Sequence, residues 1–299
     1  MKKQQWVGSG MLLLAAIIWG CAFVAQSVAM EHIGPFTFGG LRFALGGVAL
    51  LPVIFVRRRQ GISGGRLRDL LVGGVLCGCF LFFASAAQQI GLLYTTVGKS
   101  GFITALYVVL VPVAGLLLFR RRVSPLLMIS VAAAVGGLYL LCGQTGLSLN
   151  KGDVYTFFCA LLFTGHILTV DHVAERVDGV QLSCMQFFVC ALLNGITALM
   201  FEPAVTVTMV VDSWLPLLYT GLLSSGVAYT LQILGQKRTP PAVASLLMSL
   251  ESVFAVLAGA ILLGQWLTPR ETVGCCLMFA AVLVAQIPTT SKQKRTSRE

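Results

Sequence analysis

Two charged side chains stand alone in long apolar stretches of this sequence. Arg42 is the only Lys, Arg, Asp or Glu in residues 32–56, and Glu251 is the only one in residues 239–269. If these stretches cross a lipid bilayer, each charge costs about 2.5–3.5 kcal/mol on insertion scales, so such residues are rare and commonly functional. Counting the helical rise from each end places both groups in or near the outer half of the membrane.

The chemistry open to these two groups is binding and proton transfer. An arginine binds a carboxylate through its planar fork, or it extends toward lipid headgroups and backbone carbonyls. A carboxyl group away from water disfavours its own charge. Glu251 can therefore exchange a proton, attract an ammonium group, or stand fixed by a partner such as Arg42. One cation and one anion suit a zwitterion such as an amino acid, and they equally suit a salt bridge to each other.

Neutral polar and aromatic side chains in the apolar stretches form a second tier of candidates. Alone, each is most simply an interhelical hydrogen bond worth about 0.6 kcal/mol. Together they supply enough donors, acceptors and aromatic faces to line a small cavity. The candidate site residues are Arg42, Glu251, Gln88, Gln232, Trp19, Tyr107, His166 and Tyr229.

The sequence lacks the common catalytic and metal-binding patterns. It contains no H-E-x-x-H and no G-x-x-x-x-G-K-[ST], so neither a zinc hydrolase nor direct use of ATP is expected. The nine cysteines fall in or at the ends of apolar stretches, without ligand spacing, which indicates buried thiols rather than a metal site or disulfides. We expect no cofactor, no metal and no enzymatic activity.

The composition requires membrane helices to position these groups. Hydrophobic residues make up 57% of the 299 residues and charged residues only 11%, against about 25% charged in soluble domains. This balance excludes a soluble enzyme, a disordered chain and a nucleic-acid binder. About 20 apolar residues cross the hydrocarbon core, which predicts an all-α membrane protein with ten transmembrane helices. We place the helices near 9–29, 35–56, 70–90, 101–119, 124–143, 153–171, 180–201, 214–234, 241–263 and 270–288.

The basic residues predict how the chain is oriented. With both termini in the cytoplasm, 17 of the 21 Lys and Arg residues fall in cytoplasmic segments, and only Lys99, Lys151 and Arg270 fall outside. This split follows the positive-inside rule and explains the net charge of +10 without any nucleic acid. The first apolar stretch is too long for a signal peptide.

The sequence repeats itself weakly over two halves. A shift of 145 residues places Gly20 on Gly165, and a shift of 144 places Gln88 on Gln232. Five spans is an odd number, so the second copy enters the membrane from the opposite side, and such inverted repeats are typical of secondary transporters. We predict a first five-helix repeat at 1–147, a second at 148–290 and a basic cytoplasmic tail at 291–299.

The chain resembles the EamA family of the drug/metabolite transporter superfamily. The motifs that carry the resemblance are Trp19-Gly20, Leu41-Arg42-Phe43, Leu106 to Pro112, Ser249 to Ala255, and Leu262 to Gln265. Family members usually have Leu-Glu-Pro in the ninth span and an acid at its end. Here Ser252 and Gln265 occupy those positions, which favours a straighter ninth helix and removes one gating contact.

These observations predict a secondary transporter of a small organic metabolite, such as an amino acid, that works by alternating access in the cytoplasmic (plasma) membrane. The resemblance implies transport outward. The alternatives are an uncoupled facilitator, an importer, and, in another class, a membrane-embedded enzyme or scaffold. The expected partners are a small-molecule substrate, protons and the lipid bilayer, and the sequence does not define an oligomeric state.

The topology can be tested with reporter fusions. A reporter joined after Lys151 should lie outside the cytoplasm, and one joined after Glu299 should lie inside it, because the positive charges orient the spans. The measurement is the activity of a reporter that works on only one side of the membrane. Equal activity from both fusions would contradict the ten-span arrangement.

Overall fold

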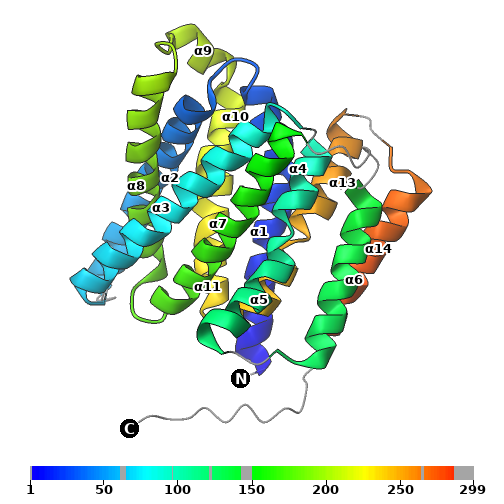
Figure 1. The fold of residues 1–299 in the computed structure, drawn as a ribbon. Coiled ribbons are helices and arrows are strands. Elements are labelled where there is room, and N and C mark those ends of the chain that lie inside the picture. Colours follow the sequence, from blue (N-terminus) through cyan, green and yellow to red (C-terminus); the bar gives the residue numbers. More distant parts are fainter. Residues whose placement is uncertain are drawn as a thin grey trace.

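The computed structural model describes residues 2–60, 65–95, 97–120, 123–142, 150–263 and 266–285. Its described elements are helices that pack side by side in a bundle (Figure 1), with one isolated antiparallel bridge between Gly65 and Val177. The predicted tail, the predicted boundary between the halves and Gln265 lie outside the described residues.

The helices follow the apolar stretches of the sequence. Within the described residues, eight helical segments are long and apolar enough to cross a membrane. The predicted spans at 124–143 and 270–288 correspond to helices of 18 and 17 residues. The elements are α1 (Lys2–Ala29), α2 (Pro35–Arg59), α3 (Leu67–Leu92), α4 (Val97–Thr104), α5 (Tyr107–Phe119), α6 (Pro125–Cys142), α7 (Lys151–Val173), α8 (Gly179–Phe201), α9 (Val207–Asp212), α10 (Trp214–Leu218), the π-helix η1 (Tyr219–Tyr229), α11 (Thr230–Gln236), α12 (Pro241–Met248), α13 (Glu251–Leu263) and α14 (Pro269–Ala285).

The fourth and ninth predicted spans are each two helices instead of one. The fourth breaks between Thr104 and Tyr107, and the ninth breaks between Met248 and Glu251. The expectation of a straighter ninth helix is therefore wrong. Ser252 lies within α13, after the break, so the chain turns here without a proline at that position.

The helix boundaries recur along the chain at a constant interval. α4, α5 and α6 begin at residues 97, 107 and 125, and α12, α13 and α14 begin 144 residues later in each case. α3 and α11 likewise end at residues separated by 144. This is one of the two shifts that align the sequence halves.

Helices from the two halves of the chain interleave instead of forming separate bundles. α3 packs against α7 and α8, α1 against η1, α11 and α13, and α2 against α8, while α6 and α14 stand together at one edge (Figure 1). Two glycines show how close these helices approach: a Cβ added to Gly78 would overlap Val189 of α8, and one added to Gly137 would meet the backbone of α14. Such small residues are common where membrane helices meet.

The helices α2 and α8 are joined at both ends. At one end the Glu202 carboxylate accepts hydrogen bonds from the backbone N–H groups of Phe36 and Thr37, at 2.7 and 2.8 Å, and from the Thr37 hydroxyl at 2.6 Å. A carboxylate at a helix N-terminus accepts from the N–H groups that have no partner within the helix, and its negative charge interacts favourably with the helix dipole. At the other end Arg57 forms an ion pair with Asp178 at 2.6 Å, and Asp178 caps α8 by accepting from two of its backbone N–H groups.

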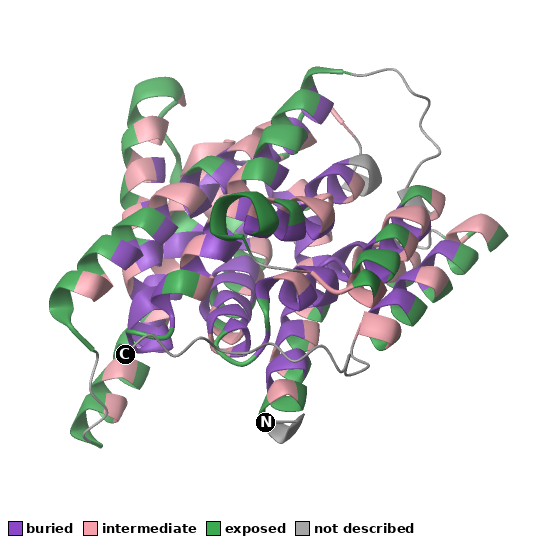
Figure 2. Ribbon diagram, turned by 60° about the horizontal axis from the view of Figure 1, so that its bottom comes forward, coloured by how far each residue is buried: buried purple, intermediate pink, exposed green. Residues whose placement is uncertain are grey.

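Apolar side chains face outward as well as inward. Figure 2 shows buried residues concentrated in the middle of the bundle and exposed ones around it. Among the exposed residues, the Leu199 side chain is 89% accessible and that of Ile261 is 81% accessible. A soluble protein does not expose such a surface at large scale, whereas lipid chains cover it at no cost. The chain is therefore an integral, multi-pass membrane protein.

Basic side chains gather at one end of the bundle, where several helices meet. Lys237 donates to the Val177 carbonyl at 2.7 Å, next to the Arg57–Asp178 ion pair. Arg238 donates to the Leu234 carbonyl and to the sulfur of Met11 in the first half of α1. These contacts bring segments from both halves together at the end of the bundle where the chain begins (Figure 1).

Removing the Glu202 carboxylate should destabilise the fold. Glu202→Ala leaves the donors at the start of α2 without their partner, at a cost of about 1–3 kcal/mol. The measurement is the midpoint of thermal unfolding of the detergent-solubilised protein, which should fall. Glu31→Ala, at an exposed position just before α2, serves as the control and should leave the midpoint in place. Equal midpoints for both variants would contradict the capping role.

Candidate functional site

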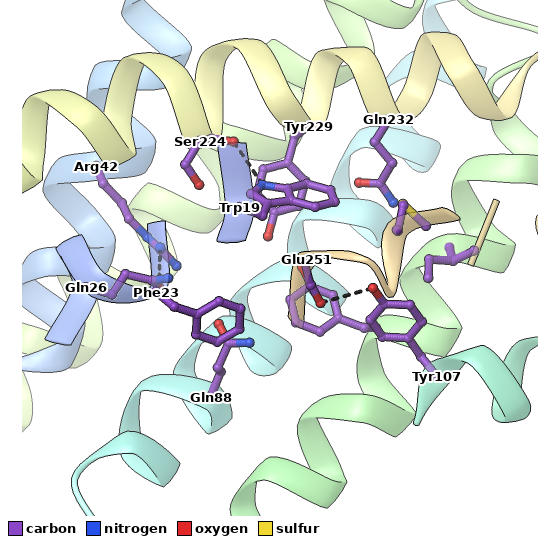
Figure 3. Close-up of a pocket in the computed structure, with 13 residues that line it drawn as sticks. Trp19, Phe23, Gln26, Arg42, Gln88, Tyr107, Ser224, Tyr229, Gln232 and Glu251 are labelled. Atoms are coloured by element: carbon purple, nitrogen blue, oxygen red, sulfur yellow. Dashed lines mark hydrogen bonds between the residues drawn. The ribbon is translucent and has the colours of Figure 1, made fainter. Parts of the chain in front are cut away.

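A pocket lies among the helices near their broken segments. It is lined by side chains from α1, α2, α3, α5, α7, η1, α11, α12 and α13, so both halves of the chain contribute (Figure 3). The lining residues are Trp19, Phe23, Gln26, Arg42, Gln88, Tyr107, Phe163, Ile167, Ser224, Tyr229, Gln232, Met248 and Glu251.

Seven of the eight candidate residues from the sequence line this pocket. His166 is the exception: it is fully buried behind the wall. Its Nε2 lies 2.9 Å from Gln186 Oε1, and its ring meets that of Tyr229 edge-on at 6.1 Å between centroids. His166 therefore supports a residue of the wall and does not face the pocket itself.

Arg42 forms one pole of the pocket. Its Nη1 donates to Gln26 Oε1 at 2.7 Å, and its guanidinium lies over Phe43 at 4.6 Å and Phe38 at 5.4 Å from the ring centroids. The side chain is almost completely buried, and its Nε has no hydrogen-bond partner among the described residues. The neighbours that hold the cation are thus an amide and two aromatic rings.

The sequence left open a pair between Arg42 and Glu251, and the structure does not form it. Arg57–Asp178 is the one ion pair in the described part of the chain. Arg42 and Glu251 instead lie apart in the pocket, which the aromatic rings of Trp19, Phe23 and Tyr229 also line (Figure 3). Neither side chain therefore serves as the ion-pair partner of the other.

Glu251 forms the other pole together with Tyr107. The Tyr107 hydroxyl donates to Glu251 Oε1 at 3.0 Å. Each of the two is the first residue of the second half of a broken helix, α5 or α13. Backbone N–H groups at the start of both helices are hydrogen-bonded, as Val109 N–H is to the Leu106 carbonyl and Phe254 N–H is to the Leu250 carbonyl. The two residues are 144 positions apart, so they occupy equivalent positions in the two halves of the chain.

Aromatic side chains, chiefly Trp19 and Tyr229, line the same pocket as Arg42 and Glu251, and we call them the aromatic wall. The rings of Trp19 and Tyr229 meet edge-on at 4.8 Å, and Tyr229 also contacts Phe43 and Phe187 at about 6 Å. Trp19 Nε1 donates to the carbonyl of Ser224 at 3.2 Å. Ser224 and Tyr229 belong to the π-helix η1, an irregular form found frequently at functional sites.

Two glutamines at equivalent positions in the halves add amide groups to the pocket. Gln88 Nε2 lies 3.4 Å from the Thr104 hydroxyl oxygen, at the end of α4. Gln232 Oε1 has no partner within the described residues. Amides both donate and accept, so this part of the pocket can bind polar groups of either kind.

The sequence did not single out the remaining lining residues. Gln26 carried a usable signal, because it is an amide inside an apolar stretch and lies one span before Arg42. Phe23, Phe163, Ile167 and Met248 carried none, because apolar residues are equally frequent in the core of any membrane protein. Within the described residues, no group of three or more His, Cys, Asp or Glu is placed to hold a metal ion.

A helical membrane protein with a central polar pocket and broken helices has the plan of a transporter. The sequence profile of the EamA-like transporter family matches this chain twice, at residues 6–143 and 150–286. The chain therefore belongs to the EamA-like transporter family.

Individual relatives agree with this assignment. An uncharacterized transporter of Archaeoglobus fulgidus is 31% identical over 280 residues, which cover 92% of this chain and 84% of that protein. The threonine/homoserine exporter RhtA of Escherichia coli K12 is 28% identical over 314 residues, which cover 99% and 96% of the two chains. A protein of known crystal structure shares the fold with a TM-score of 0.77 at 20% identity, covering 93% of this chain and 96% of its own.

Replacing Arg42 by lysine should impair transport without removing the protein from the membrane. Lysine keeps the charge but lacks the planar fork that pairs with a carboxylate and stacks on Phe43. We expect the rate of substrate flux to fall at least about tenfold. Membrane yield and substrate flux are measured together, with Arg58→Lys, at an exposed position, as the control. Wild-type flux in the Arg42→Lys variant would assign Arg42 a purely structural role.

Proposed function

We propose that this protein is a secondary transporter that exports a small organic metabolite bearing a carboxylate, such as an amino acid. The observation that carries the proposal is Arg42: a buried guanidinium on the wall of the pocket without an acid to balance it. Keeping an unpaired charge away from water is unfavourable, so the arrangement favours a ligand that brings the anion. No enzymatic activity is proposed.

The substrate would lie along the aromatic wall between the two poles. Its carboxylate would pair with Arg42, whose Nε is without a partner in the described structure. Its ammonium group would face Glu251 and the rings of Trp19 and Tyr229, since cations are attracted to aromatic faces. The amides of Gln88 and Gln232 would bind further polar groups.

Alternating access would arise from the two similar halves. Three features support inverted repeats of five spans each: the family profile that matches twice, the helix boundaries that recur after 144 residues, and the interleaved packing. In such folds the site lies between the repeats, and rocking one packing into the other opens it to the opposite side. The breaks in the fourth and ninth spans lie beside the pocket, where a change of helix angle would alter its shape.

The charge distribution and a relative support the proposed direction and location. The basic side chains at one end of the bundle support cytoplasmic termini in a plasma membrane. The relative RhtA is named a threonine/homoserine exporter, which supports export of an amino acid here. Glu251 is the proposed proton carrier, because a carboxyl group in this setting can bind a proton on one side and release it on the other.

The function is tested by flux in proteoliposomes that contain the purified protein. The probes are L-threonine and L-homoserine, each compared with its carboxamide, which lacks the negative charge. We expect saturable exchange of the amino acids and weak exchange of the amides. Substrate flux that ignores a pH gradient would favour the uncoupled facilitator, and no flux for a broad panel of carboxylates would contradict the proposal.

Replacing Glu251 by glutamine should separate substrate binding from proton coupling. Glutamine keeps the size and most hydrogen bonding of Glu251 but cannot ionise. We expect the variant to reach the membrane normally, to lose flux driven by a proton gradient, and to retain exchange of substrate across the membrane. Flux and intravesicular pH are recorded together.

The other outcomes assign different roles to this side chain. Loss of exchange as well would make Glu251 a ligand of the substrate. Gradient-driven flux equal to that of the wild type would contradict both roles and leave Glu251 as a structural residue that holds Tyr107.

A further inference from the structure

The polar contacts of Arg42 lead to a glutamine that joins three helices. Gln26 of α1 accepts two hydrogen bonds at its Oε1, from Arg42 Nη1 of α2 at 2.7 Å and from Gln89 Nε2 of α3 at 2.6 Å. All three side chains are more than nine-tenths buried. Figure 3 shows Gln26 beside Arg42 at one end of the pocket.

The chemistry of the donors fixes the orientation of the Gln26 amide. A guanidinium has five N–H groups and no acceptor, so the atom that faces Arg42 must be the oxygen of Gln26. The second donor, from Gln89, meets the same oxygen. Gln26 therefore offers Arg42 a neutral acceptor, and the hydrogen bond from Gln89 fixes the position of that acceptor.

The neutrality of Gln26 decides what Arg42 can do. A buried arginine is commonly paired with a carboxylate, and a glutamate of nearly the same size at residue 26 would supply one in a charge-assisted, strongly bound pair. Glutamine satisfies one N–H of the guanidinium but leaves its unit charge uncompensated, and the Nε remains without a partner in the described structure. The charge stays available on the pocket side.

We infer that Gln26 is a specificity-determining residue: by holding Arg42 with a neutral acceptor, it makes the pocket select ligands that carry a carboxylate. This inference rests on the proposed function and identifies the residue that sets its substrate class. Gln26 is a positioning residue because it orients the guanidinium of Arg42. It sets the specificity because it is neutral, so the charge of Arg42 is left for the carboxylate of the ligand.

The test compares the exchange of L-threonine with that of L-threoninamide in proteoliposomes at about pH 6.5, where the amino groups of both probes are mostly protonated. The two probes differ at the carboxyl group alone, so the ratio of their initial rates reports selection for the carboxylate. In Gln26→Glu the new carboxylate should pair with Arg42, and the ratio should fall at least about tenfold. A midpoint of thermal unfolding equal to that of the wild-type protein reports that the variant is folded.

Two further variants separate charge from packing. Gln26→Met is neutral and similar in size, and it removes the acceptor, so the preference for threonine over its amide should remain even if both rates fall. Gln88→Glu adds the same charge to the pocket at a side chain that contacts Thr104 and not Arg42. Its rate ratio should fall less than that of Gln26→Glu.

The results distinguish a failure of the role of Gln26 from a failure of the proposed transport function. A wild-type ratio in Gln26→Glu, with flux intact, would overturn the role of Gln26 and leave the proposed function standing. Equal loss of the ratio in Gln26→Met and Gln26→Glu would also overturn it, because shape and not charge would then be the cause. Absence of flux for both probes in the wild-type protein would overturn the proposed function together with the inference.

Discussion

A lipid bilayer offers no hydrogen-bond partners, and the remaining features of this protein depend on that constraint. Each polar group inside the bundle must find its partner in the chain or in a ligand. Most do so locally, as Thr164 does by donating to a carbonyl of its own helix. Around the pocket the partners come from different helices instead, as in the Gln89–Gln26–Arg42 chain and the Tyr107–Glu251 bond. Arg42 has a neutral hydrogen-bond partner but no acid beside it, so its charge is not balanced within the described residues.

The similarity between the two halves is one of backbone more than of side chains. Tyr107 and Glu251 begin equivalent half-helices and touch each other, so a neutral donor in one copy faces an acid in the other. Arg57 and Glu202 are likewise related by the shift of 145 residues, and each joins α2 to α8 at opposite ends of the bundle. The matching helix boundaries thus carry different charges in the two halves, and the pocket contains Arg42 from one half and Glu251 from the other.

The sequence was sufficient for the class of fold and for much of the pocket. Long apolar stretches with one charge each are unusual enough to identify Arg42 and Glu251, and amides such as Gln88 are conspicuous in the same setting. The breaks within the fourth and ninth spans were not predictable, because neither Ala105-Leu106 nor Ser249-Leu250 contains a residue that ends helices. His166 was misplaced for a related reason: which face of a helix meets a cavity depends on neighbours that lie far away in the sequence.

The position of Trp19 gives this protein an optical reporter of its own. The sequence contains four tryptophans, and Trp6, Trp214 and Trp266 are each more than half exposed at the surface of the bundle. Trp19 alone lines the pocket, where its indole N–H is bonded to a carbonyl of η1 and its ring meets Tyr229. A molecule that settles against the aromatic wall changes the surroundings of one indole and leaves the other three as an internal reference. Occupancy of the pocket should therefore change the emission spectrum of the unmodified protein, without a label and without a vesicle.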